Sequence, residues 1–154
     1  MNHMNHTKKS LTILAVAALA VAALAPVASA RGLGGWGGHA DNPSQATSFS
    51  ENWNAVAYNG SNTARWDIPL VIDNVGSLTP VAYVYVSGAS SNVSCSSQAV
   101  SQDQSTISNT VWASPSVGNA WTSVTPGTVT TVTNGSAEIA CFLGNGSKVQ
   151  TVTW

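Results

Sequence analysis

Asn92-Val-Ser-Cys-Ser-Ser-Gln-Ala-Val100 and Gly135-Ser-Ala-Glu-Ile-Ala-Cys-Phe-Leu143 are two strand-like stretches that hold the only cysteines of this 154-residue chain. A disulfide between Cys95 and Cys141 would join two strands that lie far apart in the sequence. Closing a loop of roughly 47 residues in this way would constrain the unfolded chain by about 4 kcal/mol. We therefore take this pair as the feature around which the fold is organised.

The first thirty residues have the three parts of a secretory signal peptide. Lys8 and Lys9 form a basic start, residues 11–24 are apolar except for one threonine, and Ala28-Ser-Ala30 is a small-residue cleavage site. We expect cleavage after Ala30, with an uncleaved anchor as the alternative, and a secreted protein, extracellular or periplasmic. Two cysteines in an exported chain are expected to pair rather than to remain free.

Charge is scarce in residues 31–154, where three cations stand against six acids, a net charge of −3. Nucleic-acid binders need clustered Lys and Arg to displace counterions from phosphates, so this balance argues against a nucleic-acid partner. It also disfavours anionic membrane surfaces, and no stretch after the signal peptide is long and apolar enough to span a membrane as a helix.

Residues 31–47 form a glycine-rich segment that ends in a turn signal. Glycine loses the most conformational freedom on ordering, so we expect a flexible leader here. In the alternative, Trp36 and His39 bring the leader back onto the domain or onto a partner. The single folded domain is then expected over residues 48–154.

Short β-branched and aromatic runs alternate with turn signals every 8–12 residues or so after the leader, and no helical periodicity is present. This pattern predicts an all-β fold, an antiparallel β-sandwich or small barrel with about seven to eight short strands and one disulfide. Nine stretches are the candidates from which these strands are drawn: residues 49–58, 65–73, 80–87, 92–100, 105–112, 120–124, 128–133, 136–143 and 147–154.

Local signals add three expectations about the sheets. Pro69 cannot donate a ladder hydrogen bond, which places its strand at an edge or next to a bulge. Residues 80–87 are apolar on both faces, which predicts a central strand. Asn134-Gly135 is a hairpin signal, so residues 128–154 are expected to form a three-stranded meander.

Three features stand in the last sixty residues or so: Cys95 after a Tyr- and Val-rich strand, Ala137-Glu-Ile-Ala-Cys-Phe-Leu143, and Gly146-Ser-Lys-Val-Gln-Thr-Val152. With these features, the end of the chain resembles a group of small uncharacterised secreted bacterial β-sandwich proteins. In that group a late cysteine strand is followed by a Gly-Ser turn and a final strand. The resemblance implies this strand arrangement and no activity.

No constellation typical of catalysis stands out, and we expect no enzyme activity, no cofactor and no metal site. The one histidine of residues 31–154, His39, lies in the glycine-rich leader, whereas a catalytic base has to be held rigidly. A glycosidase would need two carboxylates facing one cleft, and some pair of the scattered acids could meet in space. These acids are Asp41, Glu51, Asp67, Asp73, Asp103 and Glu138.

Tryptophan is the most suggestive residue type in the chain. Its rings either fill the core or, when exposed, present flat faces that stack on sugars. The candidate ligand platform consists of Trp53, Trp66, Trp112 and Trp121.

The leading functional hypothesis is a non-enzymatic secreted β-domain that acts as a surface, matrix or interaction module. Its partner would be another extracellular protein or a second copy of the chain, because the strand edges lack charge and the leader could add a strand to a neighbour. The alternative is a carbohydrate-binding module that uses exposed Trp and Tyr rings. A small secreted hydrolase is the third hypothesis.

Overall fold

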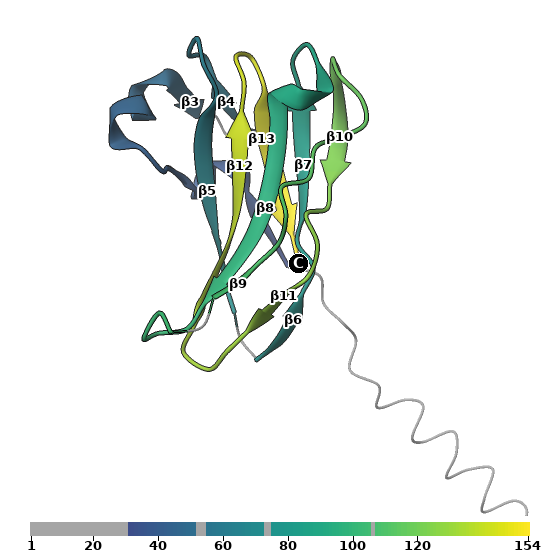
Figure 1. The fold of residues 1–154 in the computed structure, drawn as a ribbon. Coiled ribbons are helices and arrows are strands. Elements are labelled where there is room, and N and C mark those ends of the chain that lie inside the picture. The colour runs from purple at the N-terminus through teal and green to yellow at the C-terminus, as the bar shows by residue number, and fades with distance from the viewer. Residues whose placement is uncertain (1–30, 52–54, 73–74, 106) are drawn as a thin grey trace, which may run out of the picture.

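The computed structural model describes residues 31–51, 55–72, 75–105 and 107–154. The predicted signal peptide and Trp53 lie outside these residues. In the described part, two antiparallel β-sheets pack face to face, as Figure 1 shows, so the prediction of an all-β sandwich with one disulfide is confirmed. The described residues contain no helix with the length and apolar character needed to cross a membrane.

The first sheet, sheet A, has the strand order β10-β7-β13-β4-β3, and β1 also pairs with β13. The strand β7 lies between β10 and β13, which confirms the prediction of a central strand at this position. The strands of sheet A are β1 (Gly32–Gly34), β3 (Phe49–Glu51), β4 (Val56–Tyr58), β7 (Val81–Val86), β10 (Ala120–Val124) and β13 (Lys148–Thr153).

The second sheet, sheet B, has the order β2-β5-β12-β8-β9, and two further strands, β6 and β11, form a separate pair. Three 3-10 turns, η1 (Gly35–Gly37), η2 (Pro43–Ser48) and η3 (Ser90–Asn92), connect the strands. The strands of sheet B and of the separate pair are β2 (His39–Ala40), β5 (Ala64–Leu70), β8 (Val93–Val100), β9 (Ile107–Asn109), β12 (Ser136–Leu143), β6 (Gly76–Leu78) and β11 (Val129–Thr131).

Successive side chains of a strand point to opposite faces of its sheet, so each sheet turns one set of side chains toward the other sheet. The core lies between these two inner faces. In β7 the small and β-branched residues face inward, while the tyrosines between them face outward. The two inner faces are almost wholly apolar, and their fully buried members include Val84, Val149 and Val152 of sheet A and Ile68, Ile139 and Leu143 of sheet B.

The disulfide joins neighbouring strands of one sheet. Cys95 in β8 stands directly opposite Cys141 in β12, with 4.1 Å between the two Cα atoms. The backbone of Cys95 exchanges its hydrogen bonds with Ala113 on its other side, so the two cysteines form a non-hydrogen-bonded pair, whose side chains lie closest. Both cysteines are fully buried and face the core.

Pro69 lies at an open edge of sheet B, as its missing N–H predicts. Strand β2 pairs only with Trp66 and Asp67 of β5, so no strand of the described chain lies beside Pro69 on that side. The Arg65 carbonyl accepts from Asp41 on this same side, and residues of β5 that are two apart point their backbone groups in the same direction. Pro69 therefore costs the sheet no hydrogen bond.

The predicted meander over residues 128–154 is wrong. Strand β11 pairs with β6, whereas β12 lies in sheet B and β13 in sheet A. Asn134 does adopt a positive φ of 57°, so the turn forms, but it does not close a hairpin. The physical reason is burial: β12 and β13 cover opposite sides of the core with Ile139 and Val149, and each strand can only do so from a different sheet.

The glycine-rich segment 31–47 differs from the expected flexible leader. Strand β1 pairs with β13 of sheet A and β2 pairs with β5 of sheet B, so the segment links both sheets. The indole Nε1 of Trp66 donates a 2.8 Å hydrogen bond to the Gly35 carbonyl. A side chain at Gly35 would collide with the Val149 carbonyl, so glycine here permits close backbone approach rather than motion.

Two neighbouring serines of β8 lead to opposite stability predictions. Ser97 faces the core, and its hydroxyl has no hydrogen-bond partner among the described residues. Ser97→Ala removes this unsatisfied group, and we expect it to raise the free energy of unfolding by about 1 kcal/mol. Urea denaturation followed by circular dichroism would measure the change.

Ser96→Ala provides the matched control on the opposite face of β8. The Ser96 hydroxyl donates a 2.7 Å hydrogen bond to the Thr110 carbonyl, which ties β8 to the neighbouring chain segment. Its loss should cost about 1 kcal/mol. A loss of stability in both variants would show that the Ser97 hydroxyl is satisfied in solution.

Candidate functional site

The outer face of sheet A carries a cluster of aromatic side chains. The register places Trp121 opposite Tyr85, and Tyr85 opposite Lys148, in one row across β10, β7 and β13. The next row places Ser123 opposite Tyr83, and Tyr83 opposite Thr151. We call Tyr83, Tyr85 and Trp121 the aromatic patch.

The rings of the aromatic patch contact one another. Tyr83 and Trp121 are stacked, with ring centroids 5.4 Å apart and planes 18° apart, and Tyr85 leans on Trp121 at 5.5 Å. The Lys148 ammonium lies 5.7 Å from the centre of the Tyr85 ring, which is within cation–π range. Tyr83 and Trp121 remain 39% and 40% exposed, so the patch is both ordered and accessible.

The four tryptophans of the predicted platform are not assembled on one surface. Trp66 is 2% exposed and faces the core, where its ring packs on Phe49, so it cannot stack on a ligand. Trp112 is exposed and packs on Phe142, whose position in β12 is on the outer face of sheet B. Trp121 belongs to the aromatic patch on sheet A, and Trp53 lies outside the described residues.

Sequence reasoning missed Tyr83 and Tyr85, the partners of Trp121. The apolar character of both faces of residues 80–87 predicts a central strand and does not single out its tyrosines. The sequence does hold a signal, because tyrosine alternates with alanine and valine in this strand. Residues two apart share a face, so the amphipathic tyrosine rings lie on one face and the aliphatic side chains between them on the other. Nothing in the sequence indicated that β10 would place Trp121 beside them.

A charged cluster, formed by Arg65, Asp67 and Glu138, lies on the outer face of sheet B. The guanidinium of Arg65 donates from Nε to Asp67 at 2.6 Å and from Nη2 to Glu138 at 2.9 Å. Strands β5 and β12 position these groups, because the three side chains all alternate with core residues. Three of the six acids therefore gather around one arginine, because Asp41 also lies 4.0 Å from Nη1 of Arg65.

Burial raises the pKa of Asp67 above its ordinary value, and the hydrogen bond from Arg65 offsets part of that rise. Burial also raises the pKa of Glu138, with the nearby charge of Asp67 adding to the effect and Arg65 opposing it. In both cases the loss of hydration is the largest cause. In this cluster burial disfavours the charged form of both carboxylates, and the positive charge of Arg65 stabilises that form.

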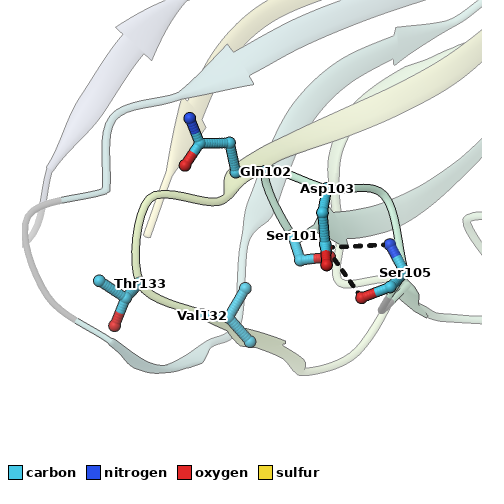
Figure 2. Close-up of a pocket in the computed structure, with 6 residues that line it drawn as sticks. All are labelled: Ser101, Gln102, Asp103, Ser105, Val132 and Thr133. Atoms are coloured by element: carbon cyan, nitrogen blue, oxygen red, sulfur yellow. Dashed lines mark hydrogen bonds between the residues drawn. The ribbon is translucent and has the colours of Figure 1, made fainter.

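A shallow depression of about 580 Å³ lies between the loop after β8 and the turn after β11. Figure 2 shows the hydroxyl and the backbone N–H of Ser105 near one carboxylate oxygen of Asp103. The hydroxyls of Ser101 and Ser105 and the Ser105 N–H lower the pKa of Asp103 to about 2. Among the described residues that line this depression, Asp103 is the one carboxylate, so they do not supply the facing pair that glycoside hydrolysis needs.

The acidic and histidine side chains of the described residues do not gather into a metal site. The described residues include no group of three or more His, Cys, Asp or Glu side chains placed to hold a metal ion. His39 lies opposite Asp67 in the β2–β5 register, on the side of the charged cluster.

No family model and no curated protein matches the chain. Among solved structures, it is similar to a GH26-CBM35 β-(1,4)-mannanase from Podospora anserina, with 11% identity and a TM-score of 0.47 over 80% of this chain and 27% of that one. It is also similar to an isomalto-dextranase from Arthrobacter globiformis T6, with 16% identity and a TM-score of 0.43 over 80% and 23% of the two chains. The chain spans about a quarter of each matched protein, and at these values neither similarity assigns a family or an activity.

Proposed function

We propose that the protein is an exported, non-enzymatic binding module that recognises carbohydrate through the aromatic patch on sheet A. The observation that carries the proposal is the exposed contact between Tyr83, Tyr85 and Trp121 on one strand face. The apolar C–H face of a sugar ring packs against such rings, and tyrosine and tryptophan supply this area at a low cost in side-chain entropy.

Polar groups around the rings suit the hydroxyls of a sugar. Ser123 and Thr151 flank Tyr83 in its row, and Lys148 flanks Tyr85. Hydroxyl and ammonium groups donate hydrogen bonds, and the hydroxyl oxygens also accept them. A surface that combines rings with short polar side chains matches the mixed apolar and polar surface of a glycan.

The charged cluster supports binding over catalysis as the proposed role. Glycosidases keep one carboxyl group as an acid and leave the other free to act as a base or nucleophile. Here the Asp67 and Glu138 side chains both accept hydrogen bonds from Arg65, and Asp67 is 4% exposed. A small hydrolase remains the competing hypothesis.

Export is part of the proposal, and the disulfide supports it. Structural disulfides form and persist in oxidising compartments, and this one is buried in the core. Together with the signal-peptide pattern of residues 1–30, it supports a protein that works outside the cytoplasm.

Trp121→Ala tests the patch directly. If the patch binds glycan, the variant should lose at least about tenfold in affinity, because it removes the ring that both tyrosines contact. A panel of soluble and insoluble polysaccharides would first identify a ligand for the unsubstituted protein, and titration calorimetry or affinity electrophoresis would then compare the variants.

Trp112→Ala is the matched control, since Trp112 is similarly exposed but lies on the outer face of sheet B. Its affinity should equal that of the unsubstituted protein. Equal losses from the two substitutions, or no binding to any polysaccharide in the panel, would contradict the proposed function.

A further inference from the structure

Charge is distributed unevenly over the molecule. Between Asp73 and Asp103, and again between Asp103 and Glu138, the sequence has no Lys, Arg, Asp or Glu. The strands β6 to β11 lie in these two intervals, whereas the charged cluster belongs to β5 and β12. Figure 1 shows β10 at the edge of the sandwich, where it ends sheet A. This lateral side is therefore nearly free of charge.

This uncharged side, residues 107–124, also concentrates exposed apolar side chains. Val111 is 83% exposed, which is a large apolar surface to leave in water. The segment runs along β8, where Ala113 bridges to Cys95, and then forms β10 at the edge of the other sheet. The exposed apolar residues of this segment are Ile107, Val111, Trp112, Val117 and Trp121. Trp112 lies on the outer face of sheet B and Trp121 on that of sheet A, so the two rings border the uncharged side from opposite faces.

Strand β10 ends sheet A with an open edge. Among the described residues it pairs only with β7, so its other side presents unpaired backbone N–H and C=O groups. Natural edge strands are usually protected by charged residues, proline or a bulge. The five residues of β10, Ala-Trp-Thr-Ser-Val, contain no charge and no proline.

We propose that the protein forms a two-fold dimer in which β10 pairs antiparallel with β10 of a second copy, joining the two A sheets. A strand edge is self-complementary across a two-fold axis, because each donor meets the acceptor of the same strand in the other copy. A partner of opposite charge has no recognition element on this side. A second copy can approach on this side. Two copies that each carry a net charge of −3 in residues 31–154 repel each other least where the approaching surfaces carry no charge.

Pairing of two five-residue strands alone buries little surface. A stable dimer therefore needs apolar side chains next to β10 to bury further surface. Val111 and Val117 belong to the segment that precedes β10 and are exposed, and we expect them to add buried apolar area to the interface. This inference does not depend on glycan binding. If both hold, Trp121 on β10 would bring the two aromatic patches side by side, and the dimer would bind a long glycan through two linked sites.

Sedimentation velocity of the exported form, recovered from culture medium, tests the dimer over a range of concentrations. The sedimentation coefficient should rise from the monomer to the dimer value as concentration increases. Ser123→Lys puts a charge on the exposed face of β10, which two-fold pairing places beside the same face of β10 in the second copy, and should weaken dimerisation at least about tenfold.

Ser50→Lys is the matched control, because Ser50 is an exposed residue of β3, the edge strand at the other end of sheet A. It should dimerise like the unsubstituted protein. Val111→Asp, which alters the flanking surface and not the strand, should weaken the dimer as Ser123→Lys does, and circular dichroism would verify that each variant is folded. A monomer at every concentration, or a dimer unaffected by Ser123→Lys, would overturn the proposal.

Discussion

Replacing both Cys95 and Cys141 with alanine should lower the free energy of unfolding by about 4 kcal/mol. The two residues are separated by 46 positions, so the bond removes a large amount of conformational freedom from the unfolded chain. A domain of this size has a total stability of about 5–15 kcal/mol, so the loss is a large fraction of it. Guanidinium or urea titration of both proteins would measure the difference.

Reduction of the unsubstituted protein separates the contribution of the crosslink from that of packing. Because both sulfurs are fully buried, dithiothreitol should reduce the bond slowly under native conditions and rapidly once denaturant unfolds the chain. The reduced protein should lose about as much stability as the alanine variant if loop entropy dominates. A loss below about 1 kcal/mol in both would refute the view that the crosslink is a main source of stability.

Arg65→Met has the second largest expected effect, a loss of about 3 kcal/mol, since it leaves two carboxylates without their cation. Asp67 is 4% exposed and loses a 2.6 Å hydrogen bond, and Glu138 loses one of 2.9 Å. Methionine keeps much of the length of the arginine side chain, so packing against the sheet changes little. Thermal and urea denaturation at neutral pH would measure the loss.

The pH dependence of the Arg65→Met variant gives a second readout. Burial already raises the pKa of Asp67 in the folded protein, and removing Arg65 raises it further. A folded-state pKa above the ordinary value of 3.8 means that the folded protein takes up the proton at a higher pH than the unfolded chain. The variant should therefore recover stability as the pH falls from neutrality through that raised pKa, with no further gain below 3.8.

Two companion variants show whether the unpaired charge is the cause. Arg65→Met combined with Asp67→Asn should recover part of the lost stability, because the buried group is then neutral. Arg65→Lys should be intermediate, since lysine keeps the charge but lacks the planar fork that reaches both carboxylates. If the double variant is no more stable than Arg65→Met, the loss does not come from buried charge.

The fold class and the crosslink followed from local signals. Short β-branched runs between turn residues predicted an antiparallel sandwich, and two cysteines behind a signal-peptide pattern predicted their pairing. Pro69 placed its strand at an edge, because the missing N–H acts at a single residue and needs no knowledge of the partner strand. The structure bears out these three points.

The pairing of strands could not be predicted in the same way. The Asn134-Gly135 turn specifies a backbone conformation at two residues, but whether the flanking strands pair depends on which side of the core each must cover. The glycines of residues 31–47 likewise predicted a flexible backbone. In the structure Gly35 lies against β13, where a side chain would not fit.

By itself, then, the sequence determined most of the strand-forming stretches after residue 48, which cysteines bond and where charge is missing, since these properties belong to single residues or to their immediate neighbours. The strands β1, β2 and β6 were not among them. Only the tertiary structure decided that Tyr83 and Tyr85 join Trp121, that Trp66 is buried, and that Arg65 connects Asp67 to Glu138. Such groupings arise across strands from distant parts of the chain, and strand order and register, which bring those side chains together, are set by packing of the whole core.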